Sequence, residues 1–306
     1  MKISVIVSTF PIKRFPDLVD ICNAMKKQSY DNFELLFIID ENKEFVSKVE
    51  AYIQEQKLDF ARVIFNENNY GLSYSRNFGI KSSLGEICAF LDDDAIPSEN
   101  WLSEMVETFN ENTSIGAVTG DVLPLWEDEE SMKWFPKELY WMISCSYILT
   151  PLTKQEVERG FGVNMAFKKD VLDKVGFFDE NLGIKPGKWI GGEDTEMFLR
   201  VKDHHYKVMF NPEIKVLHKV PKDRLFLKNI LKRAYNGGVS VAKMRKRSKI
   251  KIKKSAERHY LKKILCEFYP QVLLNIFKIG LFITIRKIVV VTLVSIFEFL
   301  GYIWRR

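Results

Sequence analysis

The stretch Glu86-Ile-Cys-Ala-Phe-Leu91, followed at once by Asp92-Asp93-Asp94, decides the fold of this chain. An apolar run of this length predicts a buried β-strand, and the three carboxylates lie where the strand ends. In an open parallel sheet, the carboxyl ends of the strands border the crevice in which ligands bind. Acidic oxygens placed there can hold a hard divalent cation and, with it, a diphosphate. A second acidic group, Gly191-Gly192-Glu193-Asp194, follows about a hundred residues later.

Apolar, β-rich runs alternate with amphipathic stretches through the first part of the chain. The runs are 3–8, 33–39, 61–65 and 86–91, and the stretches between them are 15–28, 43–57 and 72–83. This alternation predicts βαβ units, and hence an α/β fold with a mainly parallel central sheet. Further along we expect a helix over 98–110 capped by Ser98, strands over 115–123, 161–167, 206–210 and 214–218, and helices from Lys169 and Glu193.

Residues 124–160 lose clear periodicity and gain aromatic side chains. These are Trp126, Trp134, Phe135, Tyr140 and Trp141. A long aromatic insertion in an α/β enzyme is more often a binding lip than an idle loop.

Charge is distributed unevenly along the 306 residues, although the net value is only +6. Residues 1–214 carry 23 Lys/Arg and 36 Asp/Glu, whereas residues 215–263 carry 18 and 2. Such a basic block can bind nucleic acid, form a solvated helix face or lie on anionic lipid. We disfavour nucleic acid, because 243–263 has no aromatic residue before Tyr260 and leads directly into apolar sequence.

Two apolar segments, 271–285 and 288–304, close the chain. Each is shorter than the roughly 20 residues that span a bilayer, and Lys278 and Glu298 interrupt them. The polar residues of the first segment share one sector of a helical wheel, which is typical of a helix lying in the membrane interface. A membrane hairpin and a buried helical subdomain remain alternatives. We therefore predict a catalytic domain over 1–220, a basic helical linker over 221–263 and membrane-associated apolar helices over 264–306.

The four cysteines are far apart and form no CxxC pair, which indicates reduced, cytosolic chemistry. The N-terminus reads directly as a strand rather than as a signal peptide. We expect the catalytic part to stay inside the cell, at the cytoplasmic face of the cell membrane.

Several polar residues stand where a ligand could bind, and each has a simpler alternative. Asp40 ends the second strand and could accept from a base N–H, or could cap the next helix. Arg76 can lie near phosphate or near the carboxylates. Asp194 follows two glycines at a helix start, where the helix dipole favours a charged base, although Glu193 and Asp194 could merely cap that helix.

The order of these motifs resembles the family 2 glycosyltransferases, which are inverting enzymes of the GT-A fold. The matching motifs are Val7-Ser-Thr-Phe10, Gly71 with Arg76-Asn77, Asp92-Asp93-Asp94, Asn164-Met-Ala-Phe167 leading to Gly176-Phe-Phe-Asp179, and Gly192-Glu193-Asp194 with Arg200. Residues 218–242 are more loosely similar to archaeal dolichyl-phosphate-linked glycosyltransferases and to bacterial enzymes of surface polysaccharide. Gly237-Gly238 departs from the bulkier pattern expected there.

The resemblance implies specific roles for these residues. Thr9, Asp40 and Asp92 would hold the nucleoside, Asp94 would ligate Mn²⁺ or Mg²⁺ on the diphosphate, and Asp194 would be the catalytic base. His218 is similar to a third metal ligand of some relatives, although a lone His is more often a core or surface residue. We expect Glu193 to belong to the catalytic site with Asp194, and Asp92 to share in the metal site. Trp189 could stack on a sugar or simply pack in the core. The other residues expected in the donor site are Arg76, Asn77, Asp93, Asn164 and Gly192.

Inverting transfer needs a carboxylate to deprotonate the acceptor hydroxyl and a cation to stabilise the departing diphosphate. The chain has two acidic sites that suit these two tasks. We predict transfer from a nucleotide-sugar, a UDP-sugar above others, to a lipid-linked or other glycan acceptor at an anionic membrane surface. The alternative is a non-catalytic membrane protein that keeps the fold. A dinucleotide-dependent oxidoreductase is disfavoured, since no G-x-G-x-x-G follows the first strand.

Overall fold

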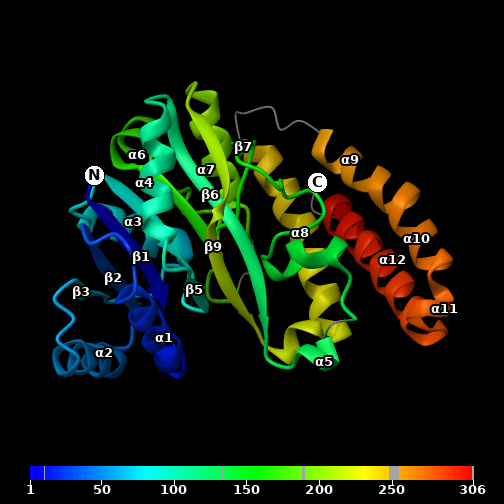
Figure 1. Ribbon diagram of the computed structural model, residues 1–306, viewed down its shortest axis with the longest axis horizontal. Helices are drawn as coiled ribbons and strands as arrows, with labels where there is room; N and C mark the ends of the chain where they lie inside the picture. The colour runs from blue at the N-terminus through cyan, green and yellow to red at the C-terminus, as the bar shows by residue number, and fades with distance from the viewer. Residues whose placement is uncertain (10, 133, 188–189, 248–254, 305–306) are drawn as a thin grey trace. The chain divides into compact units, whose positions relative to one another are not determined.

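The computed structural model describes residues 1–9, 11–132, 134–187, 190–247 and 255–304 (Figure 1). It divides into two compact units. The first, the catalytic unit, comprises 1–123 and 151–218, and the second, the tail unit, comprises 124–150 and 219–306. The predicted functional division at residues 220 and 263 remains our proposal.

The first half of the catalytic unit is a parallel sheet, as predicted. Its strand order is β3-β2-β1-β4, and all three pairings are parallel. The strands are β1 (Ile3–Thr9), β2 (Phe33–Asp40), β3 (Ala61–Asn66) and β4 (Ile87–Leu91), joined through the helices α1 (Phe15–Met25), α2 (Lys43–Glu55) and α3 (Leu72–Ser82). The buried apolar runs form strands because helices cover both faces of a parallel sheet.

The other half of the sheet is antiparallel, so the sheet is mixed and the prediction of a mainly parallel sheet was wrong for this half. The order continues β4-β8-β6-β9-β5, and a short β7 pairs with β9. The strands are β5 (Ala95–Pro97), β6 (Ile115–Trp126), β7 (Gln155–Glu156), β8 (Asn164–Lys168) and β9 (Lys207–Val220), and the helices are α4 (Trp101–Glu111), α6 (Lys169–Val175) and α7 (Glu193–Asp203). The sequence pattern identifies strands but does not fix the direction in which they pair.

Two local predictions were also wrong. The helix predicted from Ser98 begins at Trp101, and the Ser98 hydroxyl has no partner among the described residues. The reason is that Ala95–Pro97 pairs with β9, so the chain is still extended where the cap was expected. The two short strands expected at 206–210 and 214–218 are one continuous strand, β9.

A hydrophobic core lies between the sheet and the helices α3, α6 and α7. Phe90 of β4 packs edge-on against Phe167 and Phe178, with ring centroids 6.1 and 5.2 Å away. Such ring pairs stabilise a core beyond the area that they bury. This core fixes the carboxyl end of β4 against the start of α7, and the two acidic groups lie at these two places.

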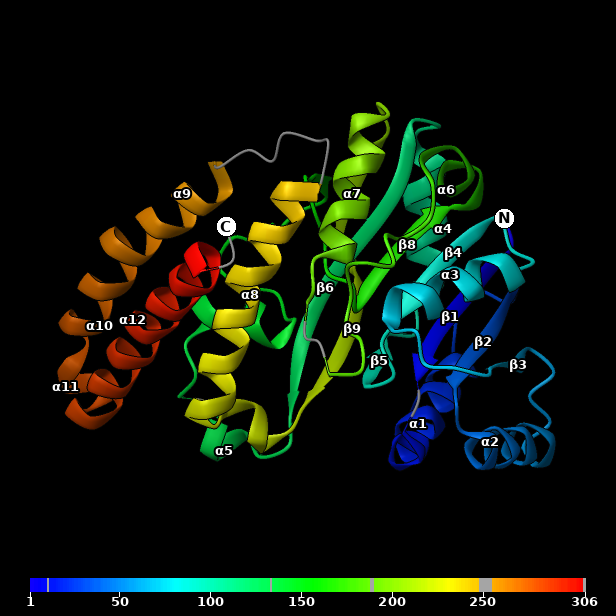
Figure 2. The same ribbon diagram turned by 180° about the vertical axis from the view of Figure 1, so that it is seen from behind.

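The tail unit is helical. Its elements include α5 (Glu129–Met132), α8 (Leu227–Arg247), α9 (Ser255–Lys263), α10 (Tyr269–Leu274), α11 (Ile276–Ile279) and α12 (Leu281–Trp304), with a π-helical turn at Ile264–Phe268. Figures 1 and 2 show that α9 to α11 run opposite to α12 and that α8 lies along α12. Gly238 faces Glu298 and Tyr302 of α12, so a larger residue would not fit, which explains the glycine that departs from the expected pattern.

The break between the apolar segments lies at Gly280 rather than at 286–287. Gly280 has φ +91, a conformation that favours glycine, and α12 continues through Arg286. Within the described residues, no helix combines the length and the apolar content that a membrane span requires.

The aromatic segment 124–150 is bound to the C-terminal helices of its own unit. Trp141 Nε1 donates to the Tyr260 hydroxyl at 3.1 Å, and that hydroxyl donates to the Glu138 carbonyl at 2.9 Å. The Arg286 guanidinium lies 3.6 Å from the Trp134 ring centroid. Of the segment predicted as a lip, 124–160, the part 124–150 therefore packs on α9 and α12, whereas 151–160 belongs to the catalytic unit.

Candidate active site

The three aspartates form the turn from β4 into β5. The neighbouring strand β1 ends at Thr9, whose hydroxyl donates to Asp93 Oδ2 at 2.6 Å. The side chains of Asp92, Asp93 and Asp94 are 33%, 16% and 5% exposed. The parallel pairing of β1 with β4 therefore brings Thr9 to the acidic turn, as expected for residues at one edge of a sheet.

Asp94 lies between His218 and an arginine that the sequence interpretation missed, Arg14. His218 Nε2 is 3.0 Å from Asp94 Oδ1, and Arg14 Nη2 is 3.0 Å from Asp94 Oδ2. The antiparallel pairing of Ala95 with His218 produces the first contact. Burial lowers the pKa of Arg14, but Asp93 and Asp94 outweigh it and hold the pKa above its usual value.

The predicted metal ligands are only partly gathered. Asp94 and His218 are in contact, but the Asp92 carboxylate is bound to Arg76 at 3.2 Å. Among the described residues, no group of three His, Cys, Asp or Glu could hold a metal ion. A carboxylate and an imidazole nonetheless fit Mn²⁺ or Mg²⁺ in sites where substrate phosphates complete the coordination.

Arg76, in α3, joins the two acidic groups. Its side chain is 4% exposed; Nη1 is 3.0 Å from Glu193 Oε1, and Nη2 is 3.2 Å from Asp92 Oδ1. Nη2 also donates to the Gly162 carbonyl at 3.2 Å. Of the two predicted surroundings for Arg76, the structure gives the carboxylates.

Asp194 is the accessible carboxylate at the start of α7. Its Oδ2 accepts from the Gly162 N–H at 3.0 Å, and Oδ1 accepts from the Thr195 N–H at 2.7 Å. These two hydrogen bonds fix the orientation of the carboxylate at the N-terminus of the helix. Gly192, with φ +96, is the N-cap, so neither acidic residue occupies the cap position itself, although Asp194 binds the Thr195 N–H of the first turn. A role of Asp194 beyond this local bond remains our proposal.

Glu193 is bound to Arg76 and is 6% exposed. Burial, followed by the charge of Asp194, raises the pKa of Glu193 to about 7, whereas Arg76 acts in the opposite direction. This placement makes Glu193 a partner of Arg76 rather than a group facing an acceptor.

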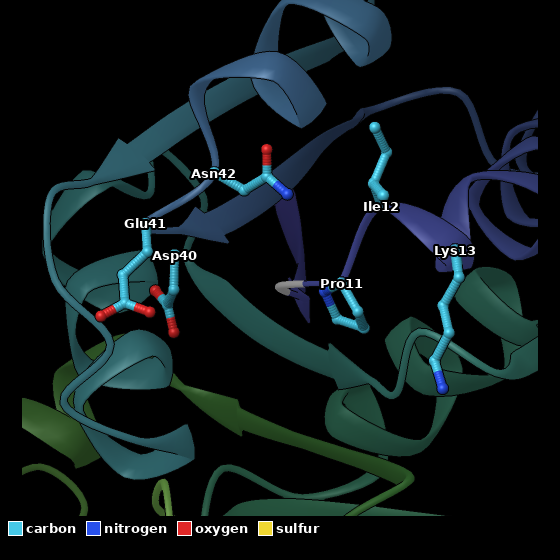
Figure 3. A pocket seen from close by; sticks show the side chains of 6 residues that line it. All are labelled: Pro11, Ile12, Lys13, Asp40, Glu41 and Asn42. Atoms are coloured by element: carbon cyan, nitrogen blue, oxygen red, sulfur yellow. The ribbon is translucent and has the colours of Figure 1, made fainter.

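Asp40 ends β2 beside a hollow of about 440 Å³ (Figure 3). The hollow is lined by Asp40, Glu41 and Asn42 on one side and by Pro11, Ile12 and Lys13 on the other. Asp40 accepts from Asn66 at 3.0 Å and from Ser75 at 2.7 Å, and burial raises its pKa. It does not cap α2, because the Asn42 side chain accepts from the Phe45 N–H at 2.9 Å.

Two predicted donor-site residues support the site from within the core. Asn164 is fully buried, accepts from Trp101 Nε1 at 2.9 Å and donates to the Ile214 carbonyl at 2.8 Å. The Asn77 side-chain amide donates to the Phe178 carbonyl and accepts from the Phe178 N–H, each at 2.9 Å. These bonds use the amide groups for the fold, so a direct role of Asn77 or Asn164 in donor binding is not what the geometry favours. Trp189 lies outside the described residues.

Arg14 and Gly162 are the site residues that the sequence interpretation missed. Arg14 is one of two basic residues, Lys13-Arg14, that follow the first strand, and this position was the available indication. A Cβ on Gly162 would lie 3.1 Å from Asp194 Oδ2 and 3.3 Å from Arg76 Nη2. The absence of a side chain therefore lets one peptide bind both residues.

Known proteins share this architecture. Residues 4–176 match the family model described as glycosyl transferase family 2. The glucosyl-dolichyl phosphate glucuronosyltransferase of Haloferax volcanii is 30% identical over 221 residues, which cover 72% of this chain and 70% of that protein. The succinoglycan biosynthesis protein ExoM of Rhizobium meliloti is 30% identical over 192 residues, 62% of this chain and 57% of that protein.

Solved structures show the same fold. The mannosyltransferase PcManGT of Pyrobaculum calidifontis, in complex with GDP-Man and Mn²⁺, superposes with a TM-score of 0.61 at 17% identity, over 88% of this chain and 71% of that chain. GalNAc-T7, with UDP, GalNAc and Mn²⁺, gives 0.58 at 17% identity, over 91% of this chain and 57% of that chain. These likenesses confirm the predicted GT-A-like fold.

Proposed function

This chain belongs to glycosyl transferase family 2 and is a glycosyltransferase, and we propose that it transfers a sugar with inversion from a nucleotide-diphospho-sugar to a hydroxyl of a lipid-linked glycan. One observation carries the proposal. Arg76 joins Asp92 of the acidic turn to Glu193 at the start of α7, so an acidic turn and an accessible carboxylate, Asp194, share one edge of the sheet. The non-catalytic alternative would not require an accessible Asp194.

Asp194 would accept the proton of the acceptor hydroxyl. The N–H groups of Gly162 and Thr195 orient its carboxylate. Asp94 and His218 would hold the divalent cation, which when bound stabilises the negative charge of the departing diphosphate. Deprotonation of the acceptor hydroxyl and departure of the diphosphate would thus depend on two different carboxylates, Asp194 and Asp94.

The nucleoside would bind at the hollow beside Asp40, next to Thr9 at the end of β1. An ionised Asp40 is acceptor-only, so it would recognise a base through an N–H, such as that of uracil. A UDP-sugar is therefore our first choice of donor. The acceptor class rests on the names of two relatives, which act on glucosyl-dolichyl phosphate and in succinoglycan biosynthesis.

The function is tested by calorimetric binding of UDP-, GDP- and dTDP-sugars to the full chain with Mn²⁺ and then with a chelator. We expect one nucleotide class to bind with metal and to be released by the chelator. Mass spectrometry and proton NMR of the product on a polyprenyl-phosphate-linked glycan should show one added sugar with inverted anomeric configuration. Absence of binding across the panel, together with absence of product, would favour the non-catalytic alternative.

The Asp94→Ala variant tests the metal assignment. We expect metal-dependent donor affinity to fall at least about tenfold, because one of the two protein ligands is lost. Asp59→Ala removes an exposed carboxylate of the same unit and serves as the matched control. Equal donor affinity in wild type and Asp94→Ala would contradict the assignment.

We also propose that the tail unit attaches the enzyme to the cytoplasmic face of an anionic membrane through the turn between α11 and α12. Apolar side chains around this turn are strongly exposed: Leu274 at the end of α10, Phe277 in α11, and Leu281 and Phe282 at the start of α12, at 81%, 101%, 62% and 77%. An exposed apolar cluster of this kind commonly marks a membrane or protein contact. The sequence has no Asp or Glu between Glu267 and Glu298, whereas Lys278, Arg286 and Lys287 lie there, and this charge favours anionic lipid.

The Phe277→Gln/Phe282→Gln variant should lose membrane binding. Burying each Phe contributes about 1.5–3 kcal/mol, so binding to phosphatidylglycerol vesicles should weaken about 10²-fold or more in co-sedimentation. Leu152→Gln removes a comparably exposed apolar side chain, 92% exposed, from the catalytic unit and should leave binding unchanged. Vesicle binding equal to wild type in the double variant would rule out this turn as the attachment site.

A further inference from the structure

The guanidinium of Arg14 is a strong cation in contact with the proposed metal ligand Asp94. Besides its contact with Asp94, Arg14 has Nη1 2.9 Å from Asp17 Oδ2 and Nε 3.5 Å from Asp93 Oδ1. Asp17 lies in the first turn of α1, three residues on from Arg14, so this pair is fixed by the helix start itself. Arg14 thus touches two carboxylates of the acidic turn and one of its own helix.

Both oxygens of Asp94 are engaged in this arrangement, Oδ1 by His218 and Oδ2 by Arg14. Asp94 and His218 would hold a divalent cation by direct contact with these ligand atoms. A guanidinium that stayed on the same carboxylate, which is 5% exposed, would face that cation across a poorly solvated site. The two positive groups therefore compete for Asp94.

We propose that Arg14 exchanges partners: it neutralises Asp94 before the cation binds, and then moves from Asp94 to the phosphate oxygens of the donor. This inference rests on the proposed function. The Arg14 side chain is 29% exposed, so it has room to move on the side facing solvent, and Asp17 can keep hold of it. A planar guanidinium fork suits a diphosphate, which it binds with two parallel hydrogen bonds.

The exchange has two consequences of opposite sign. Without Arg14, the cation no longer displaces a competitor, so the nucleotide-free protein should bind Mn²⁺ more tightly. The donor diphosphate, however, loses a cationic partner, so UDP should bind more weakly to the metal-saturated protein. A merely structural role for Arg14 would weaken both affinities.

The experiment measures both affinities on the full chain with Arg14→Gln. Free Mn²⁺ is titrated by electron paramagnetic resonance, and UDP binding at saturating Mn²⁺ is measured by calorimetry. We expect Mn²⁺ affinity to rise about tenfold and UDP affinity to fall about tenfold, a scale typical of losing one charged partner. Lys26→Gln removes one positive charge at the other end of α1 and should change neither affinity.

The results for wild type and for Arg14→Gln distinguish failure of the exchange from failure of the proposed function. If wild type binds Mn²⁺ and UDP but Arg14→Gln leaves Mn²⁺ affinity unchanged or weaker, the exchange is refuted and the proposed function stands. If wild type binds neither Mn²⁺ nor UDP, the proposed function fails and the exchange fails with it. Thermal unfolding shows whether Arg14→Gln has a fold defect. If it has, Arg14→Lys, which keeps the charge without the planar guanidinium fork, is measured instead; we expect it to bind Mn²⁺ as wild type does and UDP more weakly. Tighter Mn²⁺ binding by Arg14→Lys would overturn the exchange.

Discussion

Asp194→Asn is expected to lower kcat by about 10²- to 10⁴-fold while leaving the Kd of the donor within about twofold, because a positioned general base contributes on this scale. Asn keeps the size of the side chain but cannot accept the proton of the acceptor hydroxyl. The donor contacts proposed at Thr9, Asp40 and Asp94 lie elsewhere and stay intact. Single-turnover transfer and calorimetric donor binding are the two measurements.

The amide at position 194 also changes the local hydrogen bonds, and this must be separated from the chemistry. Both oxygens of Asp194 accept backbone N–H groups, from Gly162 and Thr195, so the amide nitrogen would face one donor. We expect this to reduce the free energy of unfolding by about 1 kcal/mol. Asp203→Asn, at the exposed end of the same helix, is the matched control for the substitution. A kcat within tenfold of wild type would remove Asp194 as the base.

The parts of the fold that could be predicted from sequence are those with local causes. Apolar runs of strand length and amphipathic stretches depend on neighbouring residues, so β1 to β4 and α1 to α3 were located closely. The direction in which β6, β8 and β9 pair depends on contacts between distant residues. Local patterns carry no information about such contacts, and the antiparallel half of the sheet was accordingly missed.

The site divides in the same way. Asp94 and Asp194 were identifiable because a carboxylate after a buried strand, or at a helix start, has local meaning. Arg14 ends a short 3-10 helix, Ile12–Arg14, at the start of α1, where a charged residue is usually solvated, and the packing of α1 near β5 brings it to Asp94. Gly162 lacks a side chain, so its peptide can approach both Asp194 and Arg76. The residues beside it in the sequence do not indicate this contact.

Arg76→Leu is expected to lower the free energy of unfolding by about 3–5 kcal/mol at pH 8, because removing one partner leaves a buried charge uncompensated. The side chains of Arg76 and Glu193 are 4% and 8% exposed, so water can replace little of the lost interaction. The Gly162 carbonyl also loses the Arg76 donor. Reversible urea unfolding measures the loss.

The second variant needed is Arg76→Leu/Glu193→Leu. A buried ion pair replaced by apolar residues is often close to neutral, so the double variant should recover most of the stability that the single variant loses. The coupling energy in the resulting double-mutant cycle should then be about 2 kcal/mol or more. Additive losses would show that Arg76 stabilises the fold through Asp92 and Gly162 instead.

The pH dependence of Arg76→Leu follows from the pKa of Glu193, which burial first and Asp194 second raise from 4.5 to about 7, while Arg76 lowers it. The folded state therefore keeps a proton that the unfolded state releases above about 4.5, so this group's contribution to stability is present at low pH and is lost as pH rises toward 7. Without Arg76 the folded pKa rises further, and the loss continues above pH 7. Arg76→Leu should consequently reduce the free energy of unfolding more at pH 8 than at pH 5. Adding Glu193→Leu should remove most of this difference between the two pH values. An equal reduction at both pH values would mean that Arg76 does not compensate the charge of Glu193.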